Sequence, residues 1–275
     1  MKTWPHHESR SPSRLLFHAL IVLLYLFLLL PVAAVTYVSF FDSQFLSFPP
    51  PGYTFHWFAN ALDQADFVSG FLTSTQVALV ATVIGVVSGV LASLALVKFD
   101  FHGKAAIKVF LMAPLLVPGI VIGTALYVFF LQIAQMTGYN ATRSMAGLVI
   151  AHVMLTIPWS VRLIVASMGM LDRSVEEAAR NLGASAWTAF WRITLPRMRS
   201  GIVAAALFSF VVSFENLEVS VLLVSPGNTT LPIAMLQYLE WSMDPTLAAA
   251  STIQILIIGA LLLISDRFVK LSQVV

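Results

Sequence analysis

The chain has 275 residues, of which 59% are hydrophobic and only 10% are Asp, Glu, Lys or Arg. Its mean hydropathy is +0.88, whereas about 25% of the residues in a soluble protein are charged, so a soluble globular fold is excluded. Cysteine is absent, which excludes disulfides and thiolate chemistry.

Six stretches are long and apolar enough to cross a membrane, which takes about 20 residues in a helix. In chain order they are residues 15–41, 71–97, 110–134, 145–165, 202–224 and 247–265. Lipid-exposed spans of this kind are helices, because each backbone polar group needs a partner inside the segment. The first stretch is too long for a cleavable signal. We therefore predict an all-α, polytopic membrane protein, with one transmembrane domain at 15–270 and tails at 1–14 and 271–275.

The basic residues predict the orientation of the chain. With six spans, both termini lie on one side, together with the loops after the second and fourth spans. That side carries 13 of the 15 Lys and Arg residues; the others are Arg143 on the opposite side and Arg162 inside the fourth span. By the positive-inside rule, both termini are expected to be cytoplasmic. The same bias explains the pI near 9.0 without nucleic acid.

The first outer loop, around residues 42–66, contains a Pro-Pro-Pro-Gly turn followed by Phe55, Trp57 and Phe58. These rings either form an interfacial aromatic belt at headgroup level or belong to a short helix that packs across the outer face. We favour the belt.

Small residues recur every fourth position in two spans, which lets helix backbones approach closely. They are Ala81, Gly85, Gly89 and Ser93 in the second span and Gly119 and Gly123 in the third. This pattern predicts tight helix packing and carries no functional specificity.

Three prolines, Pro114 and Pro118 in the third span and Pro158 in the fourth, are expected to bend or open their helices. His152 in the fourth span has no partner that the sequence reveals. We expect it to be an interior histidine with satisfied hydrogen bonds.

The fifth span contains the charged stretch FSFVVSFENLEVSVLL, with Glu215, Asn216 and Glu218 in an apolar helix. Spaced three residues apart, the two carboxylates would share one helix face, which must look into protein or a wet cavity. They mark either a pathway that prefers cations or an interhelical or interface-level ion pair.

The sequence lacks the P-loop, H-E-x-x-H and G-x-S-x-G motifs of nucleotide hydrolysis, zinc proteolysis and serine hydrolysis. We therefore predict that the chain is not an enzyme, binds no metal or cofactor, and leaves any ATP hydrolysis to another polypeptide.

The loop at 172–196, between the fourth and fifth spans, carries most of the remaining charge. Ser174 and Glu177 form an S-x-x-E capping box that predicts a helix start, and Gly183 supplies a left-handed helix end. Ser185 then begins a second, aromatic helix, which we expect to end at Pro196 before the next span. An ordinary amphipathic connector would have the same local features.

This loop also resembles the signature loop of permeases of binding-protein-dependent ABC importers, which have the MetI-like fold. The shared pattern is E-A-A, three residues, Gly, nine residues and I-x-L-P, filled here by Glu177, Ala178, Ala179, Gly183, Ile193, Leu195 and Pro196. The resemblance implies that the loop holds a cytoplasmic coupling helix that docks on the ATPase subunit, with Glu177 and Gly183 most sensitive to change.

The same resemblance implies that the chain lies in the cell's inner membrane and forms half of a translocation pathway, with a second permease, identical or homologous, and two ATPase copies that use ATP. A periplasmic binding protein would deliver the solute. The stretch VVSFENLEVSVLLVSPG is similar to permeases of the spermidine/putrescine type, which implies a polyamine or similar cationic solute. Alternatives are a permease for ferric iron, an opine or amino-acid-like compound or a phosphonate, or a secondary transporter coupled through carboxylates.

Overall fold

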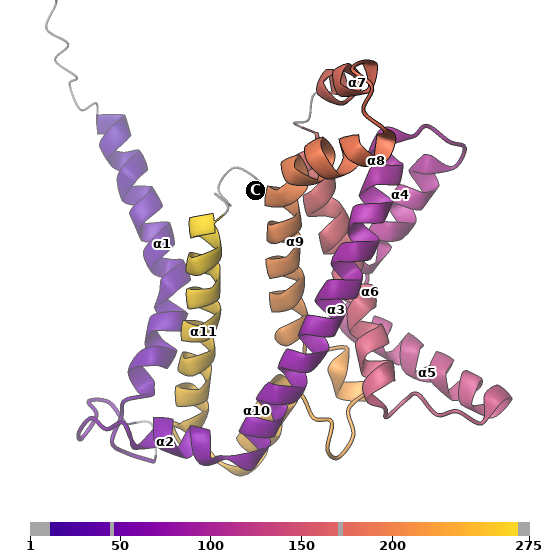
Figure 1. Ribbon diagram of the computed structural model, residues 1–275. Coiled ribbons are helices and arrows are strands. Elements are labelled where there is room, and N and C mark those ends of the chain that lie inside the picture. Colours follow the sequence, from indigo (N-terminus) through magenta and orange to yellow (C-terminus); the bar gives the residue numbers. More distant parts are fainter. Residues whose placement is uncertain (1–11, 45–46, 170–172, 269–275) are drawn as a thin grey trace, which may run out of the picture. The chain divides into compact units, whose positions relative to one another are not determined.

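The computed structural model describes residues 12–44, 47–169 and 173–268. The chain divides into two compact units, one of residues 1–61 and 243–254 and one of residues 62–242 and 255–275. Figure 1 labels the helices along the chain. Most of the predicted N-terminal tail and all of the tail at 271–275 lie outside the described residues.

The regular secondary structure of the described residues is all helical, apart from one isolated bridge between Phe41 and Tyr53. Six helical stretches in it are long and apolar enough to span a membrane, as predicted. The elements are α1 (Pro12–Val38), α2 (His56–Asp63), α3 (Ala65–Lys98), α4 (Lys104–Met112), η1 (Ala113–Leu115), α5 (Gly119–Thr137), α6 (Met145–Met168), α7 (Arg173–Asn181), α8 (Ala186–Ala189), η2 (Phe190–Thr194), α9 (Leu195–Phe214), η3 (Ser220–Leu222), α10 (Leu231–Trp241) and α11 (Thr246–Phe268).

The small residues of α3 form its contact with α6, which confirms the packing predicted from their spacing. A Cβ on Gly89 would lie 2.5 Å from the Cβ of Ser160, and one on Gly85 would lie 2.8 Å from the Cβ of Thr156. The Thr156 hydroxyl also donates to the Ala81 carbonyl at 3.0 Å, across the two helices. Only glycine leaves room for this approach.

Helix α9 packs against both α3 and α6, and these three long helices form the core of the second unit. The contact of α9 with α6 again depends on a glycine, because a Cβ on Gly201 would lie 2.6 Å from the Cβ of Ser167. Buried apolar side chains fill the space around it, including Ile164, Met198 and Ala205. The polar groups described in the next subsection lie on or next to these three packed helices.

The predicted third span is divided. Helix α4 ends at Met112, a 3₁₀ turn contains Pro114, and α5 begins at Gly119 directly after Pro118. Proline lacks an N–H and clashes with the preceding turn, so two prolines four residues apart open the helix as expected. By contrast, α6 continues through Pro158 without interruption.

The loop after α1 contains the short helix α2, as the second of our two interpretations predicted, and the aromatic belt at headgroup level stays a prediction. Trp57 is only 8% exposed, and its indole N–H donates to the Phe41 carbonyl at 2.7 Å. On the same helix, the Asn60 amide donates to Thr246 Oγ1 at 2.7 Å. These bonds fix α2 within the first unit. The helix α10, between η3 and α11, was not predicted at all.

Candidate coupling loop and polar break

The loop between α6 and α9 has the predicted helix, glycine turn and second helix. Gly183 adopts a φ of +93°, its N–H donates to the Arg180 carbonyl, and the Ala184 N–H donates to the Ala179 carbonyl, both at 3.0 Å. This pair of bonds is a Schellman motif, which needs glycine at its left-handed position. The side chain of Ser174, in the proposed capping box, lies outside the described residues.

The second helix begins at Ser185, whose hydroxyl accepts the Thr188 N–H at 3.1 Å. The expected stop at Pro196 was wrong, because α8 runs through the π-helical turn η2 directly into α9. Proline has no N–H and crowds the carbonyl four residues before it. In the widened turn, the Leu195 N–H instead reaches back five residues to Phe190, so the helix passes the proline unbroken.

An ion pair joins this loop to the core. Lys98, the last residue of α3, donates to both carboxylate oxygens of Glu176 on α7, at 2.8 and 2.5 Å. The buried hydroxyl of Thr194 donates to the same carboxylate at 2.9 Å. We call these three residues the loop clasp. It holds the end of α3, the helix α7 and the start of the fifth span together.

The pKa of the Glu176 carboxyl lies below its ordinary value of 4.5. Partial burial acts to raise this pKa, but the hydrogen bonds from Lys98 and Thr194 and the charges of Lys98 and Arg180 outweigh it. The carboxylate is therefore ionised at neutral pH, and the loop clasp is complete there.

Acidification is expected to open the loop clasp. A carboxyl group whose pKa is lowered by folding stabilises the folded state at pH values above its pKa in the unfolded chain. That contribution is lost as the pH falls through its pKa in the folded state, which lies below 4.5. Glu176→Gln should therefore lower the free energy of unfolding of the purified subunit at about pH 7 by about 1 kcal/mol or less, as for a partly exposed pair, and its thermal unfolding midpoint should fall accordingly. The difference from wild type should disappear toward about pH 3 to 4.

The control is Glu177→Gln, at the next position along the helix. Glu177 is exposed, and no ion pair is recorded for it within the described residues. Its variant should match wild type at both pH values. A constant difference between Glu176→Gln and wild type across the pH range would contradict the assignment.

The residues that the motif singled out are spread over the surface of the loop. Glu177, Ala178, Gly183 and Pro196 are exposed, whereas Ala179, Ile193 and Leu195 are half-buried. Beside them lie three large apolar side chains, Leu182, Trp187 and Trp191, with exposed fractions of 90%, 69% and 50%. We call these three the apolar tip. Exposed apolar side chains of this size mark a site of contact with another protein or with the membrane surface.

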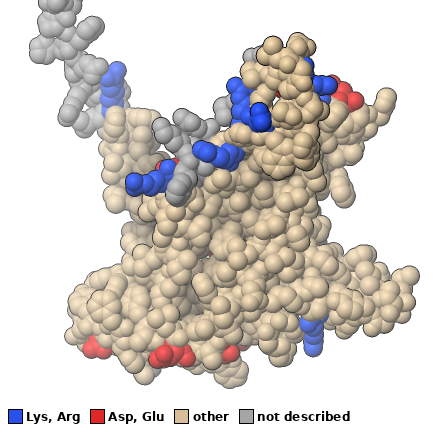
Figure 2. Space-filling model, viewed as in Figure 1, with Lys and Arg blue, Asp and Glu red and all other residues tan. Residues whose placement is uncertain are grey.

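Lys and Arg side chains gather around α7 and α8 (Figure 2). In Figure 1 these helices lie at the end of the second unit that contains the carboxyl end of α3. The loop thus combines an exposed apolar surface with a surrounding positive charge.

The fifth span ends sooner than predicted. Helix α9 stops at Phe214, and Glu215 to Val219 are not helical before η3 begins at Ser220. The assumption that Glu215 and Glu218 share a helix face was therefore wrong. We call residues 215–219 the polar break. The Asn216 side chain accepts the Val219 N–H at 3.0 Å, a local bond that competes with continued helix.

Both acidic residues of the polar break are exposed, and Asn216 is half-buried. Glu218 lies against the first residue of α5, where a Cβ on Gly119 would collide with its carboxylate oxygen Oε2. This is the amino end of a helix, where the backbone dipole favours a negative charge. Gly119 and Gly123, predicted as packing residues, thus admit the polar break beside α5, since a Cβ on Gly123 would lie 3.2 Å from Val219 Cα.

The His152 side chain contacts the residues on both sides of the polar break. Its side chain is 1% exposed, with Nδ1 2.8 Å from Ser213 Oγ on α9 and Nε2 3.0 Å from Ser220 Oγ on η3. Both ring nitrogens have partners, which confirms the expected satisfied interior histidine. The ring connects the two ends of the interrupted helix and so fixes the width of the break.

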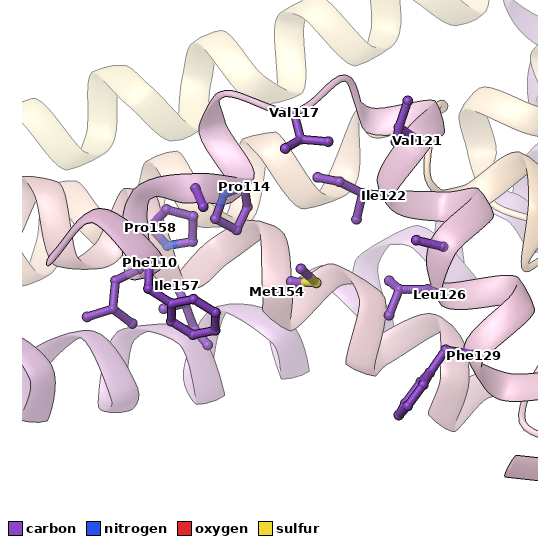
Figure 3. A pocket seen from close by; sticks show the side chains of 13 residues that line it. Phe110, Pro114, Val117, Val121, Ile122, Leu126, Phe129, Met154, Ile157 and Pro158 are labelled. Atoms are coloured by element: carbon purple, nitrogen blue, oxygen red, sulfur yellow. The ribbon is translucent and has the colours of Figure 1, made fainter. Parts of the chain in front are cut away.

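An apolar groove lies between the α4–α5 segment and α6 (Figure 3). Its volume is about 450 Å³, and its lining comes entirely from apolar residues, among them Phe110, Phe129 and Met154. It therefore offers no side-chain polar group to a charged solute. Within the described residues, no three His, Asp or Glu side chains form a group that would hold a metal ion.

Comparison with known proteins identifies the family. Residues 81–273 match the family described as binding-protein-dependent transport system inner membrane component. The chain is 30% identical over 252 residues to the putrescine transport system permease protein PotI of Escherichia coli K12, covering 91% of this chain and 87% of the relative. It is 26% identical over 254 residues to the spermidine/putrescine permease protein PotC of Haemophilus influenzae, covering 92% and 96%.

The fold is also that of a solved importer. A bacterial alginate ABC transporter, in complex with its alginate pentasaccharide-bound periplasmic protein, contains a chain with a TM-score of 0.73 and 16% identity, covering 94% of both chains. The relatives named above are transport permeases and not enzymes. The chain therefore belongs to the family of binding-protein-dependent inner membrane components, and it is a multi-pass permease of an ABC importer.

Proposed function

We propose that this permease carries a polyamine or a similar cationic organic solute. The observation that carries the proposal is its similarity, over nine-tenths of its length, to permeases named for putrescine and for spermidine with putrescine. The alginate transporter shares the fold at 16% identity and therefore says nothing about the solute.

The polar break supplies chemistry that suits such a cation. Glu215 and Glu218 are exposed carboxylates at the end of a membrane-spanning helix, and neither has an ion pair within the described residues. Irregular backbone at membrane depth is tolerated where it is buried in protein or lines a cavity. We assign Glu215, Asn216 and Glu218 to the pathway, where two carboxylates and an amide oxygen attract and bind ammonium groups.

The remaining subunits follow from the family. We propose that the chain pairs with a second permease and with ATPase subunits that hydrolyse ATP, and that a periplasmic binding protein delivers the solute. A periplasmic protein bound to the alginate transporter supports the last part. We further propose that both termini and the loop at 173–196 are cytoplasmic, in agreement with the gathering of Lys and Arg around α7 and α8.

In this arrangement the ATPase docks on the apolar tip and on the exposed residues Glu177 and Gly183. The loop clasp makes α7 move with the end of α3, and η2 joins α8 to α9 without a loop. Closure of the ATPases would therefore move the core helices as a rigid body and change access to the polar break.

The pathway assignment is tested with Glu215→Gln, which keeps the shape of the side chain and removes its charge. We expect uptake of radiolabelled putrescine by cells expressing the whole importer to fall about tenfold, the equivalent of about 1.4 kcal/mol of lost attraction. The matched control is Glu240→Gln on α10, another exposed carboxylate, which should leave uptake unchanged.

Unchanged putrescine uptake by Glu215→Gln would remove this residue from the pathway. Failure of wild type to take up putrescine or spermidine, together with uptake of a neutral or anionic solute, would overturn the proposed solute class. Membrane levels of each variant, measured by immunoblot, separate a transport defect from loss of the protein.

A further inference from the structure

We propose that a groove between α3, α4 and α6 binds the phosphate headgroup of an anionic phospholipid. The groove has a volume of about 610 Å³ and lies where α3 ends, with Leu96 and Val97 in one wall. The next residue is Lys98 of the loop clasp, so the groove opens at the α7 end of the second unit. It is separate from the polar break and from the apolar tip.

Three cationic side chains line the groove, Lys104 and Lys108 one turn apart on α4 and Arg162 on α6. Lys104 already donates to the Asp100 carboxylate at 2.8 Å and to the Phe99 carbonyl at 3.0 Å. For Lys108 and Arg162, no carboxylate lies within ion-pair distance among the described residues. The groove thus presents two uncompensated positive charges from facing helices.

Arg162 is held along the wall by its own helix, because its guanidinium carbon lies 5.8 Å from the centre of the Trp159 ring. An arginine placed in this way keeps its planar set of N–H donors available, and such a set binds phosphate oxygens in pairs. Lys108 on the opposite wall adds a compact charge to the same ligand.

The rest of the lining is apolar, with Val161 and Leu96 buried and Met112 and Val165 half-buried. A small soluble anion would satisfy the two charges but leave these walls in contact with water. An anionic phospholipid supplies both parts, a phosphate for the cations and acyl chains for the walls. Basic pockets between transmembrane helices bind lipid headgroups in this manner on the cytoplasmic side, where the proposed orientation places this groove.

The test measures lipid on the purified importer, assembled with its partner subunits. After delipidation in detergent, phosphatidylglycerol or phosphatidylcholine is added, and bound lipid is counted by native mass spectrometry. We expect phosphatidylglycerol to be retained over phosphatidylcholine. The double variant Lys108→Gln and Arg162→Gln should lose about twenty-fivefold in affinity for phosphatidylglycerol, about fivefold for each cation removed.

Two further variants keep the result specific. Arg192→Gln with Arg199→Gln removes the same charge from exposed positions in η2 and α9 and should leave retention within about twofold of wild type. Lys108→Gln alone changes one exposed side chain on α4 and should lose about fivefold, so the proposal stays testable if the double variant does not fold.

Equal retention of the two lipids, or equal losses in the groove and control variants, would overturn the proposal. Displacement of the lipid by excess inorganic phosphate would assign the groove to a soluble anion instead. Retention by the isolated chain but not by the assembled importer would show that a partner subunit covers the groove. The transported solute plays no part in this assay, so its outcome is independent of the proposed solute class.

Discussion

Gly183→Ala is expected to reduce solute uptake by about tenfold or more while leaving the subunit in the membrane. Gly183 has a φ of +93° with open space around its Cα, so the methyl group meets nothing, and the cost is the left-handed backbone itself, about 1 to 2 kcal/mol. We expect the turn to relieve this strain by adopting another backbone conformation, which changes the angle between α7 and α8. Leu182 and Trp187 of the apolar tip then no longer face a docking partner together.

The control for this variant is Gly138→Ala. Gly138 has a φ of +76° and also lies in open space, but it ends α5, far along the chain from the loop. It carries a similar backbone cost and should keep normal uptake. Co-purification of the ATPase with the permease measures docking directly. Normal uptake and normal co-purification for Gly183→Ala would remove the coupling role from this loop.

Gly89→Leu is expected to prevent stable folding of the subunit. Its Cβ would lie 2.5 Å from the Cβ of Ser160 and 3.1 Å from the carbonyl carbon of the same residue. Neither atom is the free end of a flexible side chain, so α3 and α6 must separate. Overpacking of this kind costs about 3 kcal/mol, and separation would also strain the hydrogen bond from Thr156 to the Ala81 carbonyl.

The matched change is Gly259→Leu on α11, because a Cβ at Gly259 meets no atom within 4 Å. Both variants add the same side chain to a glycine within a membrane-spanning helix. Gly259→Leu should reach wild-type levels in the membrane, whereas Gly89→Leu should be degraded and, once purified, unfold at a lower temperature. Similar thermal unfolding midpoints for the two variants would refute the close contact of α3 and α6.

The spans, the small-residue contact and the loop's glycine turn were predictable, because each depends on a local pattern. Apolar length predicts a span whatever its neighbours are, and the spacing of Gly85 and Gly89 identifies one face of one helix. A glycine after the capping pattern of α7 similarly predicts a left-handed residue. None of these inferences needs knowledge of which distant residue comes close.

The features that the sequence did not reveal depended on such distant or competing partners. The sequence gives no sign that the Trp57 indole N–H donates to the Phe41 carbonyl, which lies in another segment of the chain. Glu176 and Glu177 are adjacent in the sequence, and only the position of Lys98 decides which of them is paired. The two predicted helix ends were both wrong, in opposite directions. At Pro196 we predicted an end, but a π-helical turn lets the helix continue past the proline. At Glu215 we predicted continued helix, but the Asn216 side chain accepts the Val219 N–H and the helix stops.

The passage from α8 through η2 into α9 joins the loop to the fifth span without a flexible connector. It comprises residues 186–214, 29 residues in all, and Figure 1 shows that its axis turns between α8 and α9. Trp187 of the apolar tip lies in α8, and Glu215 directly follows the last residue of α9. Helical hydrogen bonds continue through the bend, because the Leu195 N–H donates to the Phe190 carbonyl. A displacement of α8 by a docking partner would therefore be passed to α9 and to the polar break at its end.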